Sequence, residues 1–175
     1  MQTTRYGRAL YALVVAAIVT GAHCALGPDP MEGRAAPAFS LPSLDGDTVN
    51  LADHLGKDVI VLDFWASWCP PCRQAMPAVA AVATQYRDKA VAVFGVNLGE
   101  SAATARAFLS SAGLEHLPVL LDETGTVGEQ YGARSIPRLV VIDKDGNIRH
   151  VHVGYSSNLQ STLGKSIDAL LARQS

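Results

Sequence analysis

Residues 59–77 read VIVLDFWASWCPPCRQAMP, a stretch in which an apolar run passes into two closely spaced cysteines. Residues 59–62 are aliphatic and mostly β-branched, as expected of a strand that is buried on both faces. Cys69 and Cys72 come next, and residues that favour helix follow them to about position 86. The sequence therefore predicts a strand that ends at a turn, where a Cys-x-x-Cys pair begins a helix.

The start of a helix is a favourable place for a reactive sulfur. The free N–H groups and the helix dipole there stabilise an anion, such as the thiolate of Cys69. Pro70 and Pro71 fit the first helical turn because proline lacks an N–H, and we expect them to stiffen the cysteine pair. The motif thus predicts a redox site, with Cys69 as the exposed nucleophile and Cys72 as the buried resolving thiol.

The composition of the 175 residues fits one globular domain and gives little indication of a charged partner. The formal net charge is −2 and no run of basic residues occurs, so a nucleic-acid partner is not predicted. Of the three cysteines, Cys24 lies in an N-terminal apolar segment. Cys69 and Cys72 are then the cysteines of the folded part, and none is left for a separate structural disulfide.

Residues 1–26 have the pattern of an export signal, since Arg5 and Arg8 precede an apolar run with small residues. Three outcomes stay open, because the run just reaches the length that spans a bilayer. The segment is cleaved after Ala22, lipidated at Cys24, or kept as a membrane anchor. In each case we expect the domain to lie in the periplasm or another extracytoplasmic space, and a retained segment to contact the membrane.

The rest of the chain alternates predicted strands and helices. Residues 27–36 are rich in Pro and Gly and are expected to be a linker to one domain over residues 37–175. The expected elements are a hairpin from residues 39–41 and 48–51, strands at 59–62, 91–97 and 118–121, helices at about 70–86, 101–110 and 127–131, a second hairpin from 139–142 and 148–153, and a C-terminal helix from about 158. This order predicts an α/β sandwich with a mixed sheet.

Several segments resemble the thioredoxin-like superfamily and, within it, the exported TlpA/ResA/CcmG-like branch of thiol–disulfide oxidoreductases. The resemblance is carried by VLDFWASWCPPC at residues 61–72, NLGES at 97–101 and Ile136-Pro137, and it covers about residues 36–173. It implies a thioredoxin-like three-layer sandwich with a mixed central sheet, an N-terminal β-hairpin and a central αβ insertion.

The resemblance also implies roles for residues outside the cysteine pair. Asp63 matches the acid that lies beneath the cysteines in thioredoxin and handles the proton of the resolving thiol. A structural, hydrogen-bonded acid is the alternative, since an isolated carboxylate in an apolar strand is costly. Pro137 matches a cis proline that faces the cysteines and lets the backbone of Ile136 pair with a substrate chain. An ordinary trans proline at a strand edge is the alternative.

Other residues are candidates for substrate binding around the cysteines. Trp68, together with Pro70 and Pro71, is expected to flank the disulfide and contact the substrate, whereas Trp65 is expected to pack in the core. Glu100 matches a family acid near the active-site surface, and a solvated loop acid is the alternative.

Two positions depart from the pattern of the family. Ala75 stands where many members have glutamate, which removes a candidate acid near the sulfurs. Arg138 stands where threonine is usual after the proline, and we expect it to alter the rim that faces a substrate.

These features predict an exported thiol–disulfide oxidoreductase that reduces specific protein disulfides, for example in cytochrome c maturation, with electrons from a membrane-bound reductant. The Cys69–Cys72 disulfide is its redox group, and neither a cofactor nor a metal is predicted. One alternative is a peroxiredoxin-like thiol peroxidase, which the Trp-Cys-Pro-Pro-Cys turn disfavours. The other is a copper-binding metallochaperone, although the five histidines offer no second ligand pair at suitable spacing. The partner protein, the redox potential and the oligomeric state stay open.

Overall fold

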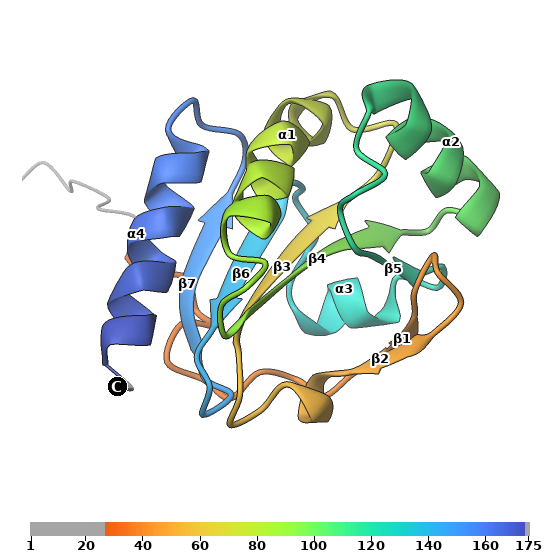
Figure 1. The fold of residues 1–175 in the computed structure, drawn as a ribbon. Helices are drawn as coiled ribbons and strands as arrows, with labels where there is room; N and C mark the ends of the chain where they lie inside the picture. Colours follow the sequence, from red (N-terminus) through yellow and green to blue (C-terminus); the bar gives the residue numbers. More distant parts are fainter. Residues whose placement is uncertain (1–26, 174–175) are drawn as a thin grey trace, which may run out of the picture.

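Strand β3 (Val59–Trp65) is the central strand of a five-stranded sheet in the computed structural model, which describes residues 27–173 (Figure 1). All seven of its residues are buried, as its apolar pattern predicts. The strand order is β5-β4-β3-β6-β7, with β3, β4 and β5 parallel and β6 and β7 antiparallel to their neighbours. The other strands of this sheet are β4 (Val91–Leu98), β5 (Val119–Asp122), β6 (Arg138–Ile142) and β7 (Ile148–Val153).

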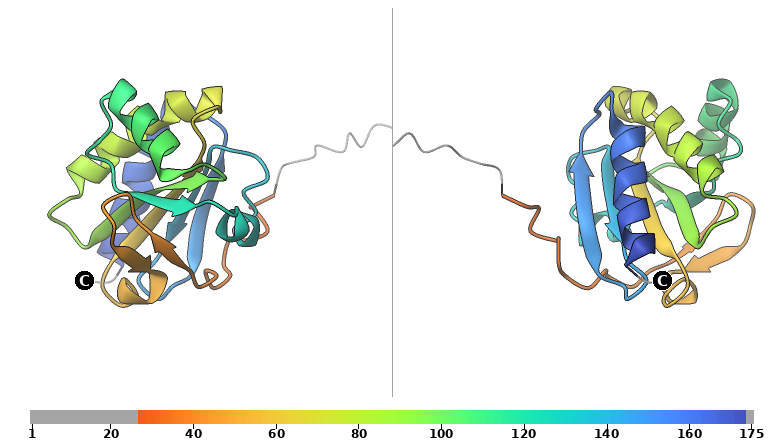
Figure 2. Two further views of the ribbon diagram at one scale, coloured as in Figure 1. Left: turned by 90° about the vertical axis from the view of Figure 1, so that its right-hand side faces the viewer. Right: turned by 60° about the vertical axis from the view of Figure 1, so that its left-hand side comes forward.

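Alternation along β3 divides the core into two layers of side chains. Val61 and Trp65 pack in the layer with α1, α2 and α4, whereas Leu62 and Phe64 pack in the layer with α3 and the N-terminal hairpin. Figure 2 shows these two groups of elements on opposite faces of the sheet. These elements are α1 (Pro70–Gln85), α2 (Ala102–Ala112), α3 (Thr126–Gln130) and α4 (Leu159–Ala172), with β1 (Ser40–Pro42), β2 (Thr48–Asn50) and the short 3₁₀ helix η1 (Leu51–Asp53). The predicted three-layer sandwich with a mixed sheet and an N-terminal hairpin is confirmed.

The expected αβ insertion is also present, as α2 and β5 between β4 and α3. Helix α2 begins after Ser101, whose hydroxyl accepts a hydrogen bond from the Thr104 N–H at 3.3 Å. It ends at Gly113, which takes the left-handed conformation that glycine adopts at little cost (φ 68°). The insertion therefore has the local end signals that its sequence predicts.

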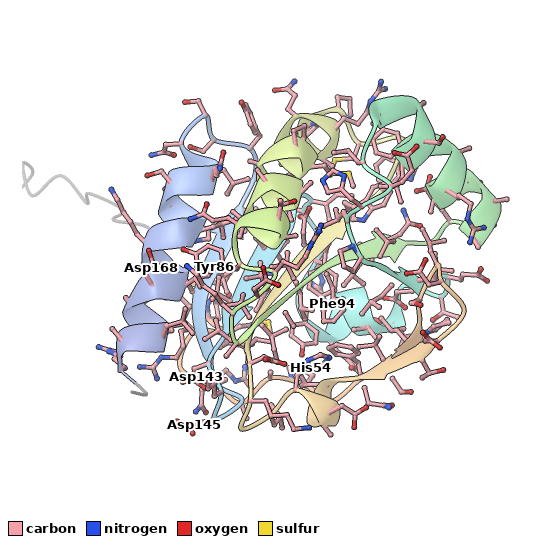
Figure 3. All side chains as sticks on the ribbon, in the orientation of Figure 1. His54, Tyr86, Phe94, Asp143, Asp145 and Asp168 are labelled. Atoms are coloured by element: carbon pink, nitrogen blue, oxygen red, sulfur yellow. A yellow bond between two sulfur atoms is a disulfide. The ribbon has the colours of Figure 1, made fainter. Side chains whose placement is uncertain are left out.

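Helix α1, which begins at the cysteines, is fixed to α4 near its other end. Tyr86 directly follows α1, and its hydroxyl oxygen lies 2.7 Å from a carboxylate oxygen of Asp168 and 3.2 Å from the Gly164 carbonyl oxygen (Figure 3). Burial, aided by the hydrogen bond to Asp168, raises the pKa of Tyr86 to about 12. The hydroxyl therefore stays protonated and can donate a hydrogen bond to α4.

Part of the segment expected to be a linker pairs with the outer edge of β7 (Figure 2). The Gly33 N–H donates to the Ile148 carbonyl at 2.7 Å, and the Ile148 N–H donates to the Arg34 carbonyl at 2.8 Å. This pairing covers part of an edge that would otherwise expose free backbone groups.

The expected export segment, residues 1–26, lies outside the described residues. Within residues 27–173, no helix has the length and apolar character needed to cross a membrane.

Candidate active site

The two cysteines lie at the start of α1, directly after β3. Cys69 is the N-cap residue, and Pro70 and Pro71 occupy the first helical turn, as the sequence predicts. The sulfurs form a disulfide across a Cα–Cα distance of 5.3 Å. The Cys72 N–H points at Cys69 Sγ over 3.2 Å, so the same N–H is placed to stabilise a Cys69 thiolate after reduction.

The site is less open than the sequence suggests. Cys72 is fully buried, but Cys69 is itself only 3% exposed, which is far from the exposed position expected for the nucleophile. Trp68, which precedes Cys69 in the chain, is 69% exposed, whereas Trp65 is fully buried and packs against Phe108. The exposed surface of this turn therefore belongs to Trp68 and the two prolines rather than to the sulfurs.

The loop before β6 lies close to the disulfide. The Ile136–Pro137 peptide bond is cis, as expected. The Ile136 carbonyl oxygen lies 3.7 Å from Cys69 Sγ, and the Pro137 carbonyl accepts a hydrogen bond from the Gly154 N–H at 2.8 Å. The structure thus brings Ile136 and Pro137, which are far from the cysteines in sequence, to the reactive sulfur.

Asp63 is fully buried in the middle of β3. Alternation along the strand places it on the same face as Val61 and Trp65, which is the face that α1 covers. Neither carboxylate oxygen has a hydrogen-bond partner among the described residues, and burial raises the pKa of Asp63 to about 7. The alternative of a hydrogen-bonded structural acid therefore finds no support in these contacts, and a group that titrates near neutral pH suits proton transfer.

Asp63 should make the stability of the oxidised protein depend on pH. Its pKa is 3.8 in an unfolded chain and about 7 in the folded protein, so between these values the folded state binds the extra proton. Stability therefore falls as the pH rises from about 4 to about 7. Between pH 5 and pH 8 this contribution amounts to roughly 3 kcal/mol.

The variant Asp63→Asn should lack that contribution. We expect its stability relative to the unsubstituted protein to rise by roughly 3 kcal/mol between pH 5 and pH 8, since other titrating groups cancel in the comparison. Urea unfolding of both oxidised proteins at the two pH values measures this difference. Equal pH dependence in the two proteins would show that Asp63 titrates normally.

Glu100 lies beside the turn that carries the cysteines, but its carboxylate is engaged within the protein. One oxygen accepts hydrogen bonds from the Ser67 N–H at 2.8 Å and from the Asn97 side-chain amide at 2.7 Å. The other oxygen accepts from the Ser67 hydroxyl at 2.5 Å. Glu100 therefore holds the turn before Trp68, and the alternative of a freely solvated loop acid does not agree with these contacts.

Ser67 and Asn97 were not identified as site residues from the sequence. Serine and asparagine are common at turns and strand ends, so only their nearness to the cysteine motif and to Glu100 could have indicated a role.

We expected Arg138 to alter the rim that faces a substrate, but its side chain is buried and does not form part of an exposed rim. Arg138 is 6% exposed, and its guanidinium donates to the Tyr131 carbonyl at 2.7 Å and to the Asp29 carboxylate at 2.8 Å. Its side chain leaves β6 on the face that α3 and the hairpin cover, because neighbouring residues of a strand point to opposite faces. Ala75, the other departure from the family pattern, is a residue of α1 whose side chain is fully buried in the core.

A groove of about 440 Å³ lies between the start of α1 and the insertion helix α2. Its lining residues are Pro70, Arg73, Gln74, Phe108, Ser111 and Ala112. No group of three His, Cys, Asp or Glu side chains within residues 27–173 is arranged to hold a metal ion.

The known proteins that this chain resembles support a redox role for the site. The sequence pattern of the family described as Redoxin matches residues 31–167. The thioredoxin-like protein YneN of Bacillus subtilis (strain 168) is 41% identical over 126 residues, which are 70% of this chain and 72% of YneN. The thiol-disulfide oxidoreductase ResA of Halalkalibacterium halodurans is 34% identical over 122 residues, which are 70% of this chain and 68% of ResA.

Solved structures give the same result. The structure of a thiol:disulfide interchange protein DsbE from Chlorobium tepidum matches with a TM-score of 0.72 and 35% identity, over 82% of this chain and 99% of that chain. The cysteine pair at the start of α1, the cis proline loop and these relatives lead to one assignment. The chain belongs to the Redoxin family and is a TlpA/ResA/CcmG-like thiol–disulfide oxidoreductase with the thioredoxin-like fold.

Proposed function

We propose that this protein is exported and reduces specific protein disulfides outside the cytoplasm. The observation that carries the proposal is the position of the Ile136 carbonyl, 3.7 Å from Sγ of Cys69, the residue that follows the exposed Trp68 in the chain. A backbone carbonyl beside the nucleophile suits pairing with an extended substrate chain, in the manner of an added strand. This arrangement supports a protein segment as the substrate.

In the proposed reaction, the Cys69 thiolate attacks one sulfur of the substrate disulfide. The substrate S–S bond breaks, its second sulfur leaves as a thiolate, and a mixed disulfide with Cys69 forms. Cys72 then passes its proton to Asp63 and attacks Cys69 Sγ, which releases the first substrate sulfur. The substrate gains two electrons, and the enzyme is left with the Cys69–Cys72 disulfide that the structure contains.

The helix start supports the first step, and Asp63 supports the second. The Cys72 N–H stabilises the negative charge on Cys69 Sγ before it attacks the substrate. Asp63 ionises near neutral pH because it is buried without a partner among the described residues, so it can accept a proton from a thiol beneath the same helix.

The wider setting rests on the sequence rather than on contacts in the structure. The apolar segment at residues 1–26 is the basis for proposing an extracytoplasmic location, with a tether to the cytoplasmic membrane where the segment is kept. The branch resemblance is the basis for proposing cytochrome c maturation as the process and a membrane-bound protein as the reductant that regenerates the dithiol.

Alkylation in intact cells tests location and direction together. We expect a membrane-impermeant maleimide to modify Cys69, the attacking thiol, without lysis. We also expect most of the protein to be in the dithiol form, because an enzyme that reduces disulfides must itself be reduced before it meets its substrate. Modification only after lysis would contradict export. A predominance of the disulfide in growing cells would contradict the proposed direction.

A further inference from the structure

An ion pair joins the N-terminal segment to the first residue of β6. Arg138 Nη2 lies 2.8 Å from Asp29 Oδ1, and Arg138 Nε donates to the Tyr131 carbonyl at 2.7 Å. The Arg138 side chain is 7% exposed and that of Asp29 is 18% exposed, so both charges are largely removed from water. Such a pair keeps a fixed geometry, because moving either partner leaves a buried charge unpaired.

Asp29 is itself held in place by the protein. Its Oδ1 also accepts a hydrogen bond from the Met31 N–H at 3.0 Å. Tyr131, whose carbonyl accepts from Arg138, is held as well, because its hydroxyl donates to the Pro37 carbonyl at 2.7 Å. Burial raises the pKa of Asp29, but the hydrogen bonds from Arg138 and Met31 outweigh it and leave the pKa lowered. The carboxylate is therefore charged at neutral pH.

Arg138, the other partner of the ion pair, adjoins the loop that faces the cysteines. Arg138 directly follows Pro137, so its anchored side chain fixes the backbone at the point where the loop enters β6. The Gly154 N–H also holds this loop, by donating a hydrogen bond to the Pro137 carbonyl at 2.8 Å. Ile136, one residue earlier, carries the carbonyl that lies 3.7 Å from Cys69 Sγ.

We propose that the Asp29–Arg138 ion pair is a strap that positions the Ile136–Pro137 loop for pairing with a substrate chain. Asp29 and Arg138 are positioning residues, and the N-terminal segment thereby belongs to the functional unit. This inference rests on the proposed role of Ile136 in binding a protein substrate. A loop held in its binding conformation pairs with an extended chain at a lower entropic cost than a mobile one.

A positioning role differs from a merely stabilising role in its dependence on the substrate. A small disulfide such as oxidised glutathione needs little pairing with the Ile136 backbone, whereas a disulfide-bonded peptide needs the loop in place. Loss of the strap should therefore raise KM for the peptide by about threefold to tenfold and leave kcat and the rate with the small disulfide nearly unchanged. Partial unfolding would lower both activities together.

The test compares Asp29→Asn and Arg138→Lys with Glu32→Gln in the full-length protein. Glu32 is a matched control because it lies in the same N-terminal segment as Asp29. Its carboxylate accepts a hydrogen bond from the Val151 N–H of β7, whereas the carboxylate that pairs with Arg138 is that of Asp29. Asp29→Asn removes the charge, and Arg138→Lys removes the fork that reaches both Asp29 and Tyr131. We expect both to show the selective rise in peptide KM, and Glu32→Gln to behave as the unsubstituted protein.

Amide hydrogen exchange at Gly154 gives a readout that does not depend on the substrate. Its N–H bonds to Pro137, so release of the loop should speed its exchange by about threefold to tenfold in Asp29→Asn and not in Glu32→Gln. Unchanged exchange, or equal loss of activity with both substrates, would overturn the strap. If the unsubstituted enzyme fails to reduce any peptide disulfide, the proposed function fails, and the exchange rate still decides the strap.

Discussion

Replacing Cys72 by serine is expected to lower the reduction of a protein disulfide by at least about a thousandfold, although the variant keeps the attacking sulfur. Cys69 Sγ still receives the N–H at the start of α1, so it can open the substrate disulfide. No second sulfur is then present to release the substrate, and each enzyme molecule stops after one attack. Cys69→Ser should lose activity to a similar extent because no attack occurs.

The measurement is single-turnover reduction of a disulfide-bonded protein by the pre-reduced enzyme, without added thiol that could replace Cys72. Cys24→Ser is the control, since the third cysteine lies outside the described residues and outside the proposed reaction. It should retain the rate of the unsubstituted protein. Appreciable turnover by either Cys69→Ser or Cys72→Ser would contradict a two-cysteine exchange.

Asp63→Asn is expected to slow release of the mixed disulfide by about a hundredfold near pH 7 while leaving the first attack nearly unchanged. The amide cannot accept the proton of Cys72, whereas Cys69 draws its stabilisation from the start of α1. In the unsubstituted protein, release should accelerate as the pH rises through about 7, because the carboxylate becomes available as a base over that range. The variant should lack this inflection.

Stopped-flow kinetics with a fluorescent disulfide substrate separates attack from release. Asp122→Asn is a matched control, because Asp122 is also buried but its carboxylate accepts a hydrogen bond from the Gly128 N–H of α3. Release at an unchanged rate in Asp63→Asn would remove Asp63 from the mechanism and leave its burial without a functional explanation.

The elements of the fold are predictable because their signals are local. The β-branched run of β3, the prolines after Cys69, the cap at Ser101 and the Asp-Gly turns each determine a short piece of backbone. The order of these pieces then restricts the topology to few arrangements. The placement of Cys69 and Cys72 at the start of a helix was predictable for the same reason, since one strand and one turn carry them.

The contacts that the sequence did not reveal join residues that are far apart in the chain. Asp29 and Arg138 are 109 residues apart, and no local pattern pairs them. The position of Arg138 after Pro137 does not by itself indicate which way its side chain points. Because side chains alternate along a strand, the Arg138 side chain lies on the face opposite the disulfide. The burial of Cys69 likewise depends on the Ile136 loop, which comes from another part of the sequence.

The most direct test of the account is the mass of the covalent complex formed by the reduced Cys72→Ser variant with a disulfide-bonded protein substrate. We expect one substrate molecule linked through Cys69, stable without reductant and released by dithiothreitol, and no such complex with Cys69→Ser. A complex that forms equally well with Cys69→Ser, or a link mapped to another residue, would contradict the assignment of Cys69 as the nucleophile.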